Sequence, residues 1–270
     1  MDMDTDEGTG WELILNAAEG ALQLVLTHDE ELVCAQRWAR SDRATEILAP
    51  VLADMARACG LRLRNLRRIA CVRGPGSFTG VRLVLTTAAA LRRAAPGLQL
   101  AGLDYLQALA TTAAMDRRLP YGAPITVLTH ARRNLVHFQP YVSYGWSIPA
   151  QLAGDVRLCT PDEACEHIAA TDIPGAVCGS GLSRNPRLPE RLAGHARLLC
   201  LDQLRLPSID ALRLLARHGD YDRTDIEPLY IRPCDAVDNL PQLAQRMGLD
   251  ADEARTELQR LLQRAPASVE

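Results

Sequence analysis

A glycine-rich stretch between an apolar strand and an Ala-rich helix constrains this chain more than any other feature. It reads Arg73-Gly-Pro-Gly-Ser-Phe-Thr-Gly-Val-Arg82. The apolar residues 68–72 before it predict a buried strand, and residues 81–95 after it predict a helix. Glycine at such a junction permits a positive φ, which we expect at Gly76, or a close backbone approach. Either Ser77 or Thr79 can cap the helix. The predicted structural turn consists of Gly74, Pro75, Gly76, Ser77, Thr79 and Gly80.

A turn that leads into a helix can also bind phosphate, because the first amides of the helix lack partners within it. Here the spacing is G-x-G-x-x-x-G, which is one residue longer than the dinucleotide-binding fingerprint. The chain contains no lysine, and this excludes a phosphate loop built on a lysine. The spacing therefore favours a structural turn over a phosphate site, and we expect no cofactor.

Composition narrows the class of protein. The chain has 270 residues, 47% of them hydrophobic, and a formal net charge of −3, so it has no overall attraction to nucleic acid. Its eight cysteines form no C-x-x-C pair and its six histidines form no H-x-x-x-H pair. We expect buried, reduced thiols and no metal site. The start of the chain has no apolar signal region, and no apolar run reaches the roughly 20 residues of a spanning helix. These features predict a soluble, cytoplasmic protein.

The chain falls into two similar halves. Residues 11–103 predict the order β-β-β-α-β-α-β, and residues 125–218 predict a similar order, with Thr160 and Glu163 as a capping box at a helix start. We read Gly179-Ser180-Gly181 as the start of a loop. The predicted organisation is a disordered N-terminus (1–10), a first lobe (11–116), a second lobe (117–235) and a helical extension (236–270).

The stretch GPGSFTGVR with its Ala-rich helix resembles the TsaB (YeaZ) family of tRNA-modification proteins. Weaker similarity lies in Glu46, Leu48 and Pro50, in His130-Ala131-Arg132, and in residues 228–232. The resemblance covers residues 11–232. It implies an α/β protein of two duplicated lobes of the actin-like ATPase and sugar-kinase type.

The resemblance also implies a function. Members of the family are non-catalytic subunits of the complex that makes N6-threonylcarbamoyladenosine at position 37 of tRNA. A TsaD-like catalytic subunit, a TsaE-like ATPase and a second copy of the chain are the implied partners, with tRNA reached only through the complex. The first strand departs from the family, because Asn16-Ala17-Ala18 stands where the family has Asp-Thr-Ser. This loss of an acid and of two hydroxyls argues against catalysis and leaves a scaffold role intact, so we expect no catalytic, cofactor or metal residues.

Two helices are candidates for a partner interface. The predicted interface residues share one side of each helix, and small side chains would let a neighbouring helix approach closely; they are Leu48, Val51, Leu52, Leu83, Thr86, Thr87 and Ala90. The alternative is that this stripe only packs on its own sheet. The residues alone favour neither, and the family resemblance favours the interface.

Other candidates carry different functions. A basic run consists of Arg62, Arg64, Arg67 and Arg68. Such a run is typical either of a tRNA-contacting patch or of a solvated surface. We favour the solvated surface, because no aromatic residues lie between these arginines. Ser77 and Ser180 lack the G-x-S-x-G context of a nucleophile elbow. Together with His130 and His137 they leave a hydrolase as an alternative. The rival to the scaffold function is therefore a stand-alone enzyme with sugar-kinase or hydrolase chemistry.

Overall fold

The computed structural model describes residues 10–39, 43–132, 134–170, 173–195 and 197–231, and six isolated positions beyond them. The chain divides into two units, residues 1–229 and 230–270, and the first unit holds every strand described below. Most of the segments predicted as a disordered N-terminus and a helical extension lie outside the described residues. Among the residues described, no helix combines the length and the apolar character needed to cross a membrane.

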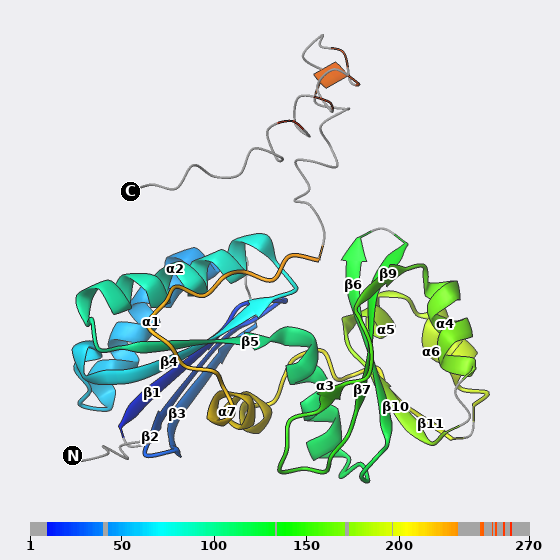
Figure 1. The fold of residues 1–270 in the computed structure, drawn as a ribbon, viewed down its shortest axis with the longest axis horizontal. Helices are drawn as coiled ribbons and strands as arrows, with labels where there is room; N and C mark the ends of the chain where they lie inside the picture. Colours follow the sequence, from blue (N-terminus) through cyan, green and yellow to red (C-terminus); the bar gives the residue numbers. More distant parts are fainter. Residues whose placement is uncertain are drawn as a thin grey trace. The chain divides into compact units, whose positions relative to one another are not determined.

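The first sheet is five-stranded, with the order β3-β2-β1-β4-β5 (Figure 1). Strands β1 to β3 form an antiparallel meander, and β4 and β5 run parallel to β1. Its strands are β1 (Trp11–Asn16), β2 (Leu22–His28), β3 (Glu31–Trp38), β4 (Leu66–Gly74) and β5 (Gln99–Asp104). The central strands are apolar on both faces, since residues 13–15 of β1 are fully buried, as expected for a sheet covered on both sides.

Helices cover both faces of this sheet. Helices α1 (Ala44–Ala58) and α2 (Phe78–Ala94) lie together on one face, where α2 contacts β4 and β1 (Figure 1). A short 3-10 helix, η2 (Leu63–Asn65), precedes β4. Helix α3 (Tyr105–Asp116) contacts strands of both sheets, and α7 (Ile209–Arg217) packs against β1, β5 and α3. Although α7 falls within the range predicted for the second lobe, it therefore covers the first sheet.

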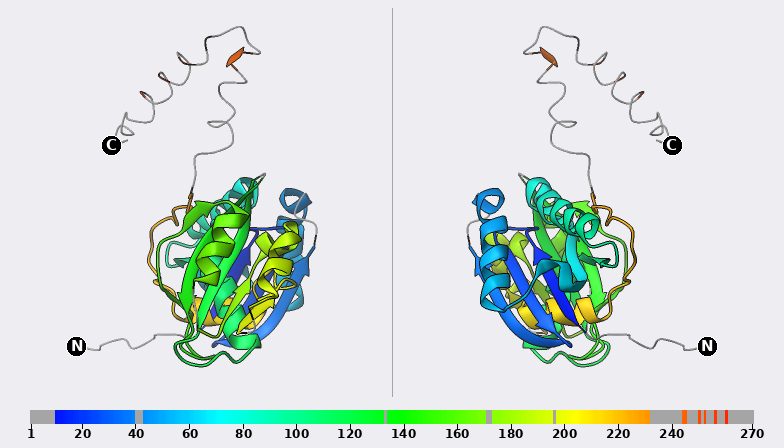
Figure 2. Two further views of the ribbon diagram at one scale, coloured as in Figure 1. Left: turned by 90° about the vertical axis from the view of Figure 1, so that its right-hand side faces the viewer. Right: turned by 90° about the vertical axis from the view of Figure 1, so that its left-hand side faces the viewer.

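The second sheet repeats the plan of the first. Its main path is β11-β10-β6-β7-β8, and β9 also pairs with β7. Its strands are β6 (Pro124–Arg132), β7 (Leu135–Val142), β8 (Gln151–Leu152), β9 (Arg157–Cys159), β10 (Gly175–Cys178) and β11 (Leu198–Leu201). Its helices are α4 (Pro161–Ala169), α5 (Ser180–Arg184) and α6 (Arg187–Leu192), and α4 and α6 pack together in front of the sheet in the left view of Figure 2. Leu128, Val136, Ile168 and Val177 belong to the core between these layers.

The two lobes are duplicates of one topology. In the first lobe the strands run β5-β4-β1-β2-β3, and the corresponding strands of the second run β11-β10-β6-β7-β9, with the same parallel and antiparallel pairings. The predicted class, an α/β protein of two duplicated lobes, is confirmed.

Local predictions held at several places and failed at two. Thr160 and Glu163 form the predicted capping box, and the strands and helices from β1 to β5 follow the predicted β-β-β-α-β-α-β order. The loop predicted from Gly179 is wrong, because α5 begins at Ser180, immediately after a glycine at φ 109°. Strand β8 was not predicted, since a two-residue strand leaves no periodic pattern to detect.

Candidate functional site: the glycine turn and the outer face of α2

The glycine turn fastens the start of α2 to the end of β1. The amide of Ser77 donates a hydrogen bond of 2.5 Å to the carbonyl oxygen of Ala18. The Ser77 side chain caps the helix by accepting from the amide of Gly80 at 3.2 Å, so Ser77 rather than Thr79 is the cap. Two of the amides with which a helix start could bind an anion are thus already occupied within the chain.

Three glycines of the turn are required, Gly74 for its positive φ as well as its close contact, and Gly76 and Gly80 for close contact alone. Gly74 has a φ of 117° and is joined to Pro75 by a cis peptide bond; a Cβ there would lie 2.7 Å from the carbonyl oxygen of Leu229. Our expectation of a positive φ at Gly76 is wrong. Instead, a Cβ at Gly76 would collide with the carbonyl group of Ala18, and one at Gly80 with that of Ala17. Close backbone approach, rather than a left-handed conformation, explains these two glycines.

The second lobe contains a matching turn. Gly179 and Gly181 follow β10 as Gly76 and Gly80 follow β4, and a Cβ on either would meet the carbonyl group of Leu128, on β6. In both lobes, therefore, glycines let the turn after the fourth strand press against the first strand. This repetition is a structural sign of duplication, and it indicates that the turn is part of the architecture of the fold.

Asn16, which stands where the resemblance predicts an acid, is buried, and both polar groups of its side chain are hydrogen-bonded. Its side-chain oxygen accepts from the amide of Ala18 at 3.0 Å, and its Nδ2 donates to Gln23 Oε1 at 2.7 Å. Gln23 in turn donates to the carbonyl oxygen of Pro207 at 2.9 Å. Asn16 and Gln23 are 0% and 2% exposed. This chain of amides joins β1, β2 and the segment before α7, so Asn16 has a clear structural role.

The outer face of α2 carries no charge over its central turns. From Leu83 to Leu91 the helix has no charged residue, and the predicted interface residues on it reach the surface: Thr86 and Ala90 are exposed, while Leu83 and Thr87 are half-buried. Val84, Leu85 and Ala88 form the opposite, buried side. A surface helix normally turns charged side chains to solvent, so this face is unusual for a helix that meets only water.

The predicted interface residues of α1 lie elsewhere. Leu48, Val51 and Leu52 are buried at 2%, 7% and 6% exposure, and Leu52 lies beside Leu13 and Leu26. They are core residues of the first lobe. The α1 part of the predicted surface is therefore not available in the chain alone, and the interface prediction rests on the four residues of α2.

A buried carboxyl group lies where the lobes meet. Burial raises the pKa of Glu19, in the β1–β2 turn, and the Ser180 hydroxyl, the Arg184 guanidinium and the Tyr105 hydroxyl partly offset this effect. One carboxyl oxygen of Glu19 has no hydrogen-bond partner within the described part of the chain. Ser180 also accepts from the backbone amide of His130 at 3.0 Å. Glu19 and Ser180 come from different lobes, so this cluster joins the lobes and gives the Ser180 hydroxyl a structural role, whereas His130 takes part only through its backbone amide.

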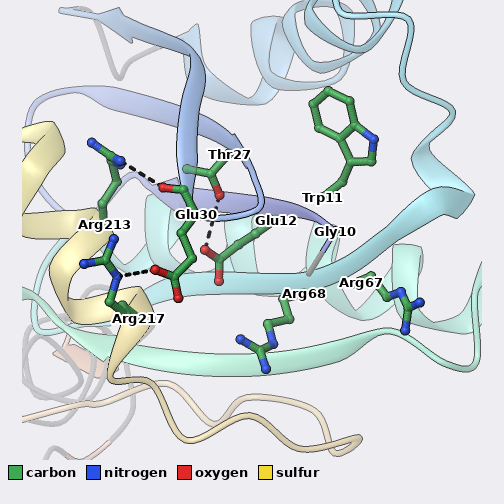
Figure 3. A pocket seen from close by; sticks show the side chains of 9 residues that line it. All are labelled: Gly10, Trp11, Glu12, Thr27, Glu30, Arg67, Arg68, Arg213 and Arg217. Carbon is green, nitrogen blue, oxygen red and sulfur yellow. Dashed lines mark hydrogen bonds and ion pairs between the residues drawn. The ribbon is translucent and has the colours of Figure 1, made fainter. Parts of the chain in front are cut away.

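Two residues of the basic run line a small pocket that also contains the ion pair of Glu30 with Arg217 (Figure 3). A small pocket near the start of β1 is lined by Arg67 and Arg68 of β4 together with Arg213 and Arg217 of α7. Arg217 pairs with the Glu30 carboxylate at 2.9 Å, and Arg213 donates to the Glu30 carbonyl at 2.9 Å.

Neighbouring groups complete this network. Arg68 lies over the ring of Tyr221 at 4.9 Å, and the Tyr221 hydroxyl donates to Glu12. The acids of the pocket thus have partners of their own, and the network ties α7 to the first sheet. Arg62 and Arg64 are exposed on and beside η2. No group of three His, Cys, Asp or Glu side chains in the described part of the chain could hold a metal ion.

Part of the chain matches the model of a known protein family. The model of the family "TsaD: tRNA N6-adenosine threonylcarbamoyltransferase" matches residues 39–156. No curated protein matches the chain in sequence.

Solved structures extend the likeness over most of the chain. YeaZ from Pseudomonas aeruginosa superposes with a TM-score of 0.68 at 22% identity, covering 83% of this chain and 100% of that one. A P. aeruginosa protein described as similar to peptidase YeaZ gives 0.66 at 23% identity with the same coverage. The class of protein is thus defined by its fold: two α/β lobes in the arrangement of YeaZ. Together with the family match to residues 39–156, this shared fold supports the resemblance to the TsaB (YeaZ) family.

Proposed function

We propose that this chain is a non-catalytic subunit of an assembly that makes N6-threonylcarbamoyladenosine in tRNA, and that it binds a TsaD-like catalytic subunit through the outer face of α2. The observation that carries the proposal is the uncharged surface from Leu83 to Leu91. Small and aliphatic side chains there can meet a second helix at close range, and no charge would need to be desolvated. In the absence of that partner the same face suits a second copy of this chain, and a TsaE-like ATPase would join the assembly.

The turn supports a scaffold role over a stand-alone enzyme. The Asn16 side chain lacks the charge of an acid, and its oxygen and nitrogen are hydrogen-bonded to Ala18 and Gln23. The amide of Ser77 is bonded to Ala18 rather than free for a phosphate. We therefore expect no ATP turnover by the purified chain. Calorimetry with ATP and Mg²⁺ checks this: micromolar binding, with turnover abolished by Asn16→Ala, would favour the kinase-like alternative.

The interface is tested by placing a charge on the uncharged face. Ala90 is exposed, so Ala90→Arg leaves the chain folded, while burying the guanidinium against a partner carries a heavy desolvation cost. We expect co-purification with a TsaD-like subunit, and self-association in light scattering, to be lost. Ala169→Arg is the matched control, because Ala169 is an exposed alanine on α4 of the second lobe. A folded Ala90→Arg variant that binds as well as the control would place the interface elsewhere.

A further inference from the structure

An exposed group of aromatic side chains lies on the second lobe, away from α2. Phe, Trp and Tyr make up only 4% of the chain, yet Tyr121, Tyr144 and Trp146 occupy two adjoining loops. Tyr121 is 76% exposed and Trp146 66%. The rings of Tyr121 and Tyr144 meet edge to face, with centroids 4.8 Å apart. We call these three residues the aromatic platform. Apolar side chains that gather on one exposed surface, rather than singly, mark a candidate binding site.

Hydrogen bonds hold the two loops of the platform together. Gly122 donates to the carbonyl oxygen of Ser143 at 2.9 Å, and Ser143 donates back to that of Ala123 at 2.9 Å. The Ser143 hydroxyl donates to the carbonyl oxygen of Leu119 at 3.3 Å and accepts from the amide of Gly145 at 3.2 Å. Because Ser143 is fully buried, these bonds fix the loops before any ligand arrives, and the rings need little ordering on binding.

Two arginines precede the platform at the end of α3. Arg117 and Arg118 are exposed, and neither guanidinium has an ion pair or a hydrogen bond among the residues that the structure describes. Arg118 has a φ of 47° and its amide bonds to Met115, so it takes the left-handed position that ends a helix. Glycine is the favoured residue there, because a side chain is strained. Arginine at that position is therefore not explained by stability.

The arginines continue into a groove between the lobes. Its volume is about 740 Å³, and its lining includes Arg37 of β3, Arg117 and Arg205. Like Arg117, both Arg37 and Arg205 lack an ion pair within the described ranges. Asp116 and Asp202 are the acids of the lining. Unpaired guanidinium groups thus outnumber carboxylates here, although the whole chain is slightly acidic.

We propose that the aromatic platform and this groove bind single-stranded RNA, with unpaired bases stacked on Trp146 and Tyr121 and phosphates held by Arg117, Arg118 and the groove arginines. Exposed rings beside free arginines are the combination that binds unpaired nucleotides, since every base has a face to stack and every linkage a charge. A protein partner would fit the uncharged α2 face better than this charged one. This inference deepens the proposed function, and it rests on that function only in taking tRNA as the RNA that is bound. The sequence predicts that the chain reaches tRNA only through the complex, whereas here the chain contacts RNA directly.

The test uses the purified full-length chain and a fluorescein-labelled single-stranded oligoribonucleotide in anisotropy titrations. We expect binding that weakens as salt rises. Trp146→Ala should lower the affinity by about five- to a hundredfold, while Trp146→Phe retains most of it because a stacking face remains. Phe78→Ala is the matched control, since Phe78 is also exposed, at 42%, on α2 and is not among the residues that line the groove. Both positions are exposed enough that the variants will fold.

Three results would overturn the inference. In the first, the oligoribonucleotide does not bind at 50 mM salt. In the second, Trp146→Ala binds as tightly as Phe78→Ala. In the third, heparin competes equally with wild type and with Trp146→Ala, which would show charge attraction alone. Failure here is distinct from failure of the proposed function: a chain that captures a TsaD-like subunit without RNA loses only this inference, and one that binds RNA without the subunit loses only the proposed interface.

Discussion

The backbone amide of Ser77 lies 2.5 Å from the carbonyl oxygen of Ala18, and this bond joins the start of α2 to the β1–β2 turn. Both residues are held there by contacts on either side: the Ser77 side chain caps α2, and the Ala18 amide bonds to Asn16. An amide at the start of α2 that could otherwise bind a phosphate is thus hydrogen-bonded to a backbone carbonyl of the chain itself. The position of α2, and with it the proposed interface, depends on this contact.

The first prediction concerns Gly76. Gly76→Val should lower the free energy of unfolding by about 2–4 kcal/mol, because the new side chain collides with the Ala18 carbonyl and displaces the Ser77 bond. Urea titration followed by circular dichroism measures the change. Gly97→Ala is the control, since a Cβ at Gly97 meets nothing within 4 Å, and its effect should stay within about 1 kcal/mol. Equal stability of the two variants would show that the close approach is relieved easily.

A second prediction addresses Asn16. Asn16→Ala leaves the Ala18 amide and the Gln23 side-chain oxygen without their partner in the core, which costs about 2–4 kcal/mol. Thermal and urea unfolding should both show it. Gln203→Ala removes an exposed amide side chain and should change stability by less than about 0.5 kcal/mol. A fully stable Asn16→Ala protein would mean that the amide chain is dispensable, and would reopen a functional reason for the residue.

The third prediction separates core from interface. Leu52→Ala should destabilise the isolated chain by about 2–5 kcal/mol, since Leu52 is buried beside Leu13 and Leu26. Leu83→Ala should cost clearly less, because Leu83 is half-buried, and it should weaken capture of a TsaD-like subunit. Chemical denaturation and pull-down, run on both variants, give the two readings. If Leu83→Ala destabilises as much as Leu52→Ala and leaves capture intact, the α2 face is core packing.

A fourth prediction follows from the pKa of Glu19, which burial raises above its ordinary value. The folded state then holds the proton more tightly than the unfolded state, so this group favours folding most at low pH. Its contribution is lost as pH rises from the ordinary value of about 4.5 through the folded pKa. Glu19→Gln should therefore gain stability relative to wild type as pH rises above the ordinary pKa of the carboxyl group.

Glu163 provides a control of opposite sign for the pH experiment. The amide and hydroxyl of Thr160 lower the pKa of Glu163, so its contribution is present above the ordinary pKa and is lost as pH falls. Glu163→Gln should lose stability relative to wild type at neutral pH, and the difference should shrink on acidification. Melting temperatures across the pH range check both variants. Parallel profiles for wild type and Glu19→Gln would show that Glu19 is solvated.

The fifth prediction sets stability against binding at Arg118. Arg118→Gly relieves the left-handed backbone at the end of α3 and should stabilise the chain by about 1 kcal/mol, raising Tm by roughly 2–4 °C. The same change should weaken RNA binding. Asn134→Gly is the comparison: Asn134 has a φ of 60°, but asparagine tolerates that conformation, so the gain should be smaller. A variant of Arg118 that is more stable and binds RNA unchanged would remove Arg118 from the proposed surface.

Sequence reasoning succeeded where the determining interactions are local. The alternation of apolar residues located most strands. Thr160 and Glu163 predicted a capping box, which spans only four residues. The repeated strand and helix order indicated two lobes, because element order is encoded along the chain. The glycine stretch was recognised as a turn, but its reason was assigned wrongly at Gly76, since the colliding carbonyl of Ala18 lies far away in sequence.

What the sequence alone determined about this protein is the type and order of its elements, the cap of α4, and the absence of lysine chemistry; each depends on residues within a few positions of one another. Only the tertiary structure decided which apolar faces are covered. Leu52 and Leu83 lie in similar sequence patterns, yet Leu52 is buried in the core, whereas Leu83 is half-buried and reaches the surface. Arg37, Arg117 and Arg205 meet in one groove because two lobes fold around it. Burial and side-chain proximity are properties of contacts between distant segments, and no local pattern records them.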